Sequence, residues 1–181
     1  ALVSVSGGVG CGVVSEGRII RGAHGLAGEM GHIVLDTRES GAASAARITW
    51  DRIADKDSLL AAYRRRTETR TSLKHLIDAQ RAHEPAALEV STTWAKWMAY
   101  GLLSVIYAYD PDVIVIAGDM AEFFEVCEDL VQSHLSKTLI NGYPRARLTT
   151  SSLGANGCAI GAAAYMHRAM FDATMIDDIA A

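Results

Sequence analysis

The sequence has few cysteines, no excess of positive charge and no long hydrophobic run. Its three cysteines, Cys11, Cys127 and Cys158, lie far apart, without the C-x-x-C or Cys/His spacing of a disulfide framework or a zinc ribbon. This sparse set is typical of a cytoplasmic protein whose thiols are reduced. The longest uncharged stretches cover residues 97–109, too short to cross a bilayer, and 148–167, rich in polar and small residues. We therefore expect no membrane partner.

Positive charge is also scarce, since 17 Lys and Arg residues face 21 Asp and Glu residues and the net charge is −4. Such a chain lacks the basic surface with which proteins bind phosphate backbones, so any DNA binding requires an additional domain. The 181 residues, 50% of them hydrophobic, fit one domain or two small lobes. The chain starts with Ala1 and enters a strand-like segment directly, without the basic region of a signal peptide. We interpret it as part of a longer protein.

The hydrophobic pattern predicts an α/β domain. Alternating apolar residues and turn signals predict a β-rich segment over 1–36, and a small, polar run predicts a loop over 37–48. A helical segment follows over 49–109, and 113–171 has a strand-helix-strand-helix pattern that starts with a strand buried on both faces. Antiparallel strands followed by parallel crossovers predict a mixed sheet with helices on both faces. The individual helices are expected at 49–69, 72–83, 86–109, 121–139 and 156–171.

A first glycine cluster, Gly7, Gly8, Gly10 and Gly12, lies at an expected turn between two strands. Without β-carbons, such a turn can bring several backbone N–H groups close to a phosphate. A tight hairpin explains the same spacing. The cluster is neither a P-loop nor a Rossmann fingerprint, because no Lys-Ser/Thr pair and no helix follow it.

A second glycine-rich segment, residues 21–32, places Glu29 and His32 three positions apart among glycines that include Gly22. A carboxylate can bind adjacent sugar hydroxyls in pairs, and an imidazole can donate or accept one more hydrogen bond. A mutually satisfied structural pair is the alternative. A metal site formed by His24, Glu29 and His32 is possible by residue type, but no neighbouring ligand supports it.

Two further features have ordinary structural interpretations. The basic stretch around Arg64, Arg65 and Arg66 contains interleaved acidic residues, which favours a solvated helix face over nucleic-acid contact. The long helix that carries Trp94, Trp97 and Leu102 is the best candidate for a dimer interface. Burial in the core explains the same pattern equally well.

Three segments together resemble the ROK family of sugar kinases and sugar-responsive repressors. They are SGGVGCGVVSEGRIIRGAHGLAGEMGHIVLD, YDPDVIVIAGDM and SSLGANGCAIGAAA. The resemblance implies the C-terminal lobe of an actin-like ATPase (ribonuclease H-like) fold over residues 1–181. It also implies an absent N-terminal lobe, with a phosphate loop and a catalytic Asp in kinases or a DNA-binding helix-turn-helix in repressors.

The resemblance places Glu29 and His32 on the family's sugar-binding Glu and on a His that contacts sugar and ligates zinc. Gly22 belongs to the same implied sugar site, and Asp51 stands in for a second sugar-contacting Glu, one methylene shorter. The family's CxCGxxGCxE zinc loop has no cysteine here, and Thr49 replaces its last zinc ligand. We therefore expect that the structural zinc is lost and that no metal is bound.

The nucleotide side departs further from the family. Ser6-Gly7-Gly8 replaces the Gly-Thr-Gly of the kinases, although Gly10 and Gly12 remain. Ala117-Gly118-Asp119 replaces a Gly-Gly-Gly-like turn near the nucleoside, and a carboxylate there disfavours an anionic nucleotide. Gly7, Gly8, Gly10, Gly12 and Gly118 would bind phosphate or nucleotide only in a kinase.

These residues predict the sugar-sensing and dimerising domain of a ROK-type repressor of carbohydrate genes, without catalytic residues or a cofactor. A sugar or amino sugar and a second copy of the chain are its expected partners, and DNA would bind only through the absent domain. The alternative is a hexose or amino-sugar kinase that uses ATP and Mg²⁺. A third possibility is a degenerate member that keeps only the fold and its dimer contacts.

Overall fold

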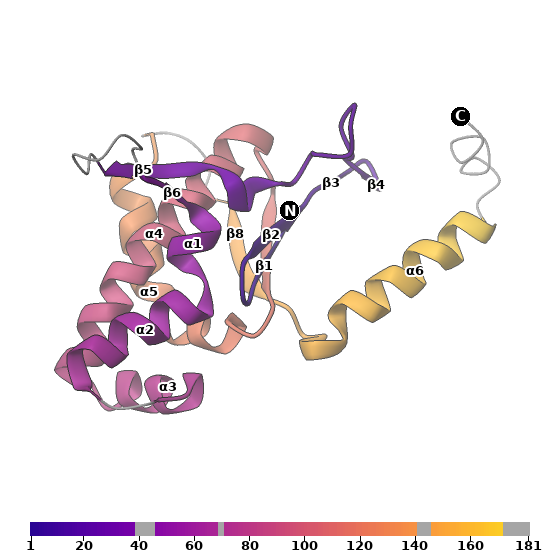
Figure 1. Cartoon of the computed structure of the whole chain (residues 1–181). Coiled ribbons are helices and arrows are strands. Elements are labelled where there is room, and N and C mark those ends of the chain that lie inside the picture. Colours follow the sequence, from indigo (N-terminus) through magenta and orange to yellow (C-terminus); the bar gives the residue numbers. More distant parts are fainter. Residues whose placement is uncertain (39–45, 69–70, 141–145, 172–181) are drawn as a thin grey trace. The chain divides into compact units, whose positions relative to one another are not determined.

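The structure is a computed structural model that describes residues 1–38, 46–68, 71–140 and 146–171 (Figure 1). The chain divides into two compact units, residues 1–150 and 151–181, which are described separately below. The first unit holds a mixed sheet, two small hairpins and five helices among its described residues. The second holds one α-helix and a short 3-10 helix in its described part.

The main sheet has four strands in the order β2-β1-β7-β8. Strand β1 (Leu2–Val5) pairs antiparallel with β2 (Val9–Gly12), and it pairs in parallel with β7 (Val113–Ala117). Strand β7 pairs in parallel with β8 (Arg147–Thr150). The predicted mixed sheet is therefore confirmed.

Strand β7 differs from the prediction of a strand buried on both faces. Ile114 and Ile116 are fully buried, whereas Val113 and Val115 are only half-buried. The burial alternates because the core of this unit covers one face of the strand, the face that carries the two isoleucines. That helices cover both faces stays a prediction, because the helix of the second unit is described by itself.

The helices of the first unit follow the predicted segments with one exception. They are α1 (Trp50–Ala54), α2 (Lys56–Thr67), α3 (Leu73–Arg81), α4 (Pro85–Tyr109) and α5 (Ala121–Thr138). The single helix predicted over 49–69 is wrong, because the chain is extended at Asp55. The Asp55 carboxylate accepts a hydrogen bond from the Ser58 amide at 2.8 Å and so begins a new helix.

Two hairpins and a short 3-10 helix complete the first unit. Strands β3 (Val14–Ser15) and β4 (Arg18–Ile19) form the predicted hairpin. The 3-10 helix η1 (Met30–His32) precedes β5 (Val34–Arg38), which pairs antiparallel with β6 (Ala46–Thr49). The loop prediction over 37–48 is therefore wrong at both ends of that segment, and residues 39–45 lie outside the described part. The small residues of the segment 37–48 give little strand signal in the sequence. Strands β5 and β6 are stabilised instead by the backbone hydrogen bonds between them.

In the second unit, η2 (Gly154–Asn156) leads into α6 (Gly157–Phe171), which confirms the helix predicted over 156–171. Among the helices that the structure describes, none has the length and apolarity needed to span a membrane.

The core of the first unit centres on two tryptophans. Trp50, at the start of α1, is fully buried against Gly101 of α4. Trp94 packs edge-on against Phe123 of α5, with ring centroids 5.0 Å apart, and its indole N–H donates to the Ala54 carbonyl at 2.8 Å. These contacts fix α1 on α4 and α4 on α5, and they position the segments around α1.

Gly101→Ala should destabilise the chain. A β-carbon at position 101 would lie 1.9 Å from the Trp50 ring, so the indole or helix α4 must shift. We expect a loss of about 1–3 kcal/mol in the free energy of unfolding, measured by chemical denaturation. Gly10→Ala is the matched control, because a β-carbon there meets nothing within 4 Å. Equal stability of the two variants would contradict this packing.

Burial raises the pKa of Cys127, on the core side of α5, from 9.0 to about 12. The unfolded chain therefore releases a proton that the folded chain retains between those pH values. The free energy of unfolding should fall as pH rises from about 9 to 12, by up to about 1.4 kcal/mol per pH unit from this group. Cys127→Ala should show a shallower alkaline profile in denaturation experiments. Parallel profiles would contradict the assignment.

Candidate functional site

The structure brings together three of the four residues predicted to bind sugar. Nε2 of His32 lies 3.6 Å from Oε2 of Glu29, and Nδ1 of His32 lies 3.7 Å from Oδ2 of Asp51. Glu29 immediately precedes η1, His32 ends it, and Asp51 lies in the first turn of α1. An imidazole thus stands between two carboxylates from segments separated in sequence.

These side chains are accessible to a ligand. The side chains of His32 and Glu29 are 71% and 59% exposed, and that of Asp51 is 25% exposed. The two His-carboxylate distances exceed the length of a good hydrogen bond, so neither pair satisfies itself fully. One oxygen of Asp51 accepts a hydrogen bond from the Thr49 hydroxyl, which orients the carboxylate. The cluster therefore offers hydrogen-bonding groups at the surface, as a polyol requires.

Two glycines let the segment that carries Glu29 and His32 lie directly on strand β2. A β-carbon on Gly28 would lie 2.3 Å from the Cys11 carbonyl oxygen, and one on Gly31 would lie 2.1 Å from the Val9 carbonyl oxygen. Gly28 also has a φ of +95°, which side chains rarely adopt. Part of the glycine repeat is thus explained by close backbone approach, which holds the cluster on a rigid strand.

Helix α1 reaches the cluster through Trp50. The Trp50 amide donates to the Ile33 carbonyl at 3.0 Å, which joins the start of α1 to the end of η1. The Trp50 side chain is buried, so the next residue, Asp51, is fixed beside His32. Core packing therefore sets the separation of the two carboxylates.

Other residues considered from the sequence lie apart from this cluster or gain no support. Gly22 lies in the loop after β4, and the three atoms nearest to a β-carbon there would all belong to Ala27. Within the described ranges, no group of three or more His, Cys, Asp or Glu side chains could hold a metal. Thr49, at the place of the last family zinc ligand, directs its hydroxyl to Asp51. The donor set does not fit a tetrahedral zinc site.

The first glycine cluster is only partly a turn. Gly10 and Gly12 lie within β2, paired with Ser4 and Leu2, so the turn narrows to Ser6, Gly7 and Gly8. The Ser6 amide donates to the Gly8 carbonyl at 2.9 Å, and added β-carbons at either turn glycine would meet open space. The tight hairpin is thus confirmed, and phosphate binding at Gly7 and Gly8 stays a prediction.

The Ser6 turn is joined to two other segments. The Ser6 hydroxyl accepts from the Asp119 amide at 3.0 Å, and the Ser6 carbonyl accepts from the Lys56 amide at 2.9 Å. Lys56 Nζ lies 2.7 Å from Asp119 Oδ2, and that hydrogen bond raises the pKa of Lys56. Gly118, where a β-carbon would lie 2.4 Å from the Val5 carbonyl oxygen, allows this close approach.

Lys56 was not singled out from the sequence, because nothing in its neighbourhood indicates a partner 63 residues away. Its ammonium group compensates the Asp119 carboxylate. The expected repulsion between Asp119 and a nucleotide is therefore smaller than the sequence alone indicated.

The dimer candidate on α4 is largely accounted for by the core. Trp94 and Leu102 are buried within the chain, whereas Trp97 is half-buried. The alternative of core burial is therefore confirmed for two of the three residues. The Trp97 and Tyr100 rings pack edge-to-face, and the Lys96 ammonium group lies over both rings.

Comparison with known proteins shows that the chain is similar to sugar kinases and to repressors. A family model described as "ROK family" matches residues 1–169. The chain is 26% identical over 162 residues to a xylose repressor of Bacillus spizizenii, covering 87% of this chain and 41% of that protein. It is 30% identical over 185 residues to a glucokinase of Aeropyrum pernix, covering 92% of this chain and 58% of that protein.

A solved structure supports the fold. It is a ROK family glucokinase from Streptomyces griseus in complex with glucose and AMPPNP, with a TM-score of 0.78 at 23% identity over 91% of this chain and 59% of that one. This likeness confirms the predicted actin-like ATPase fold class. The chain spans about half the length of the relatives it matches.

Gly31→Ala should disturb the cluster by pushing η1 away from β2. The new β-carbon would overlap the Val9 carbonyl oxygen and lie 3.3 Å from Cβ of Asp51. We expect a loss of about 1–3 kcal/mol in the free energy of unfolding and faster amide exchange around η1, measured by hydrogen-deuterium exchange. Gly12→Ala, with open space around its β-carbon, is the control. Unchanged exchange in the Gly31 variant would contradict the contact.

Proposed function

This chain belongs to the ROK family, and on that premise we propose that it is the sugar-sensing and dimerising domain of a repressor of carbohydrate genes. The observation that carries the proposal is the exposed cluster of Glu29, His32 and Asp51. DNA binding belongs to a domain outside the chain, since its net charge of −4 offers little attraction for phosphate backbones. The intact protein acts in the cytoplasm.

The cluster suits a monosaccharide. Each carboxylate can accept hydrogen bonds from adjacent hydroxyls, and His32 between them can donate or accept one more. Glu29 and Asp51 come from different segments, so a sugar held by both bridges η1 and α1. D-xylose is the first sugar to test, because the Bacillus spizizenii relative is named a xylose repressor.

Sensing requires that sugar binds one lobe arrangement of the intact protein better than another. A differential affinity of about 1–3 kcal/mol, typical of allosteric proteins, changes DNA affinity by roughly 5- to 150-fold. The cluster lies at an exposed surface, where a second lobe can close over the sugar. Closure onto Glu29 and His32 provides the differential contact.

The alternative function is an ATP-dependent hexose or amino-sugar kinase, which the likeness to glucokinases favours. The turn at Gly7 and Gly8 would then hold phosphates, with the Lys56–Asp119 pair beside it. An Asp in an upstream lobe would take the proton from the reacting sugar hydroxyl. The protein would bind a nucleotide and Mg²⁺ only in this alternative.

The repressor proposal predicts that Glu29→Gln and Asp51→Asn each weaken binding of D-xylose or a related sugar by about tenfold or more. Each substitution removes a charged acceptor and keeps the shape of the side chain. Calorimetric titration of the full-length protein measures the affinity, and Glu16→Gln on the β3–β4 turn is the control for an exposed carboxylate.

The same sugar should change the affinity of the full-length protein for its operator, measured by fluorescence anisotropy. If no sugar alters DNA binding and the two variants keep the parent sugar affinity, the sensor function is wrong. Sugar-dependent release of ADP from ATP by the intact protein would establish the kinase alternative instead.

A further inference from the structure

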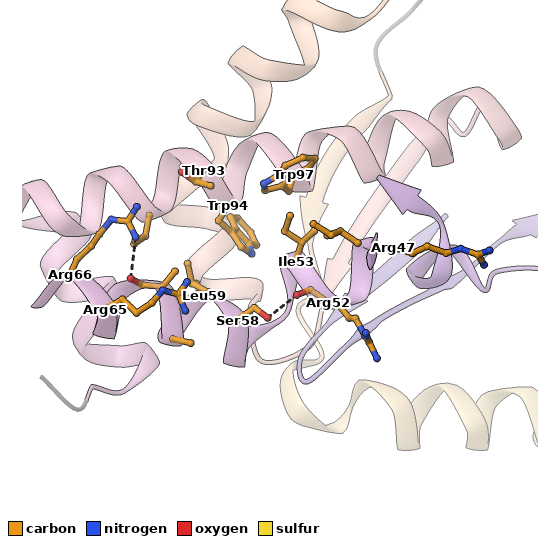
Figure 2. Close-up of a pocket in the computed structure, with 14 residues that line it drawn as sticks. Arg47, Arg52, Ile53, Ser58, Leu59, Arg65, Arg66, Thr93, Trp94 and Trp97 are labelled. Atoms are coloured by element: carbon orange, nitrogen blue, oxygen red, sulfur yellow. Dashed lines mark hydrogen bonds between the residues drawn. The ribbon is translucent and has the colours of Figure 1, made fainter. Parts of the chain in front are cut away.

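A cavity of about 500 Å³ lies between α2 and α4, closed on one side by α1 and β6 (Figure 2). It does not include Glu29, His32 or Asp51, so it is separate from the candidate sugar site. Its volume lies within the range of ligand-binding pockets. We call it the α2–α4 groove.

Four arginines line the α2–α4 groove, at its two ends. Figure 2 shows Arg47 and Arg52 at one end and Arg65 and Arg66 at the other. Arg66 is neutralised by Glu89, at 2.6 Å, and also donates to the Ala62 carbonyl. Within the described ranges, none of the other three has a carboxylate within 4 Å.

The middle of the groove is apolar. Ile53 and Leu59 lie across from Trp94 and Trp97 of α4 (Figure 2). Trp94 is 2% exposed and its indole N–H donates to the Ala54 carbonyl, so its ring forms part of the buried base of the groove. Trp97 is half-buried and borders the opening. The groove therefore combines an apolar centre with a cationic group at each end.

We propose that the α2–α4 groove binds an acidic segment of a partner protein, in which an apolar side chain lies between carboxylates. Arg47, Arg52 and Arg65, which pair with no carboxylate in the part of the chain that the structure describes, attract carboxylates, and their guanidinium forks bind them in two-point contacts. The apolar side chain of the segment packs between these ends on Ile53 and Trp97, which are half-buried. Tryptophan and arginine are the residue types on which such interfaces most depend.

An acidic protein segment fits this groove better than a phosphate backbone or a small anion. A nucleic acid has no apolar group for the centre of the groove, and the net charge of −4 opposes its approach. A small anion reaches one pair of arginines at a time and leaves the apolar centre exposed to water. Arg64, Arg65 and Arg66 are all exposed, as the prediction of a solvated helix face requires, and Arg65 and Arg66 also line the groove, whereas Arg64 does not.

The test uses a fluorescein-labelled peptide with two central leucines flanked by glutamates, and the full chain, in anisotropy titrations. We expect binding that weakens with added salt and a change in the emission of Trp97, since Trp50 and Trp94 are buried. The double variant Arg52→Glu/Arg65→Glu should bind the peptide at least about tenfold more weakly. The double variant Arg64→Glu/Arg18→Glu changes the net charge equally, away from the groove, and should bind like the parent.

Three results would overturn the proposal. The peptide does not bind, or it binds both double variants equally, or a peptide with lysines in place of glutamates binds as well. Circular dichroism of each variant excludes loss of folding as the cause. If ultracentrifugation shows that the parent chain self-associates and that Arg52→Glu/Arg65→Glu abolishes this, the occupant is a second copy and not an acidic partner segment.

Discussion

The contact of Trp50 with Gly101 is the constraint on which the rest of the first unit depends. It presses the start of α1 onto the middle of α4, where only a residue without a side chain leaves room for the indole. The indole N–H has no acceptor among the described residues, so apolar packing alone holds the ring there. Through the Trp50 amide bond to Ile33, the same contact places Asp51 beside His32.

The Trp50 contact positions residues of both candidate surfaces, the cluster of Glu29, His32 and Asp51 and the α2–α4 groove. On one side of α1, Asp51 completes the cluster with Glu29 and His32. On the other side, Ile53 forms part of the wall of the α2–α4 groove, and the Ala54 carbonyl holds the Trp94 ring. A five-residue helix therefore separates a polar surface from an arginine-lined one. The break at Asp55 is what lets α1 and α2 take different directions and serve both.

Much of this arrangement could be predicted from the sequence, because local patterns govern it. The β-branched run at 113–116 and the apolar period of α4 and α5 gave the correct element types. Glu29 and His32 were found because they lie close together in a distinctive glycine-rich segment, and Asp51 because the family resemblance extends to it. The break at Asp55 was missed, since its capping role depends on one side-chain hydrogen bond.

Contacts between distant segments left no local signal. The Lys56–Asp119 pair joins residues 63 positions apart, and neither neighbourhood indicates the other. The arginines of the α2–α4 groove come from β6, α1 and α2, so only the fold shows that they line one cavity. Strand β6 has only four residues, which gives a short signal in the sequence, and it depends on pairing with β5.

The parallel pairing of β1 with β7 also affects how the chain must fold. The register Leu2↔Val115 joins strands between which all of α1 to α4 is inserted. During synthesis, the β1–β2 hairpin leaves the ribosome well before β7, with which β1 pairs in parallel. The late closure of so long a loop predicts slow folding, with a helical intermediate that forms before the sheet is complete.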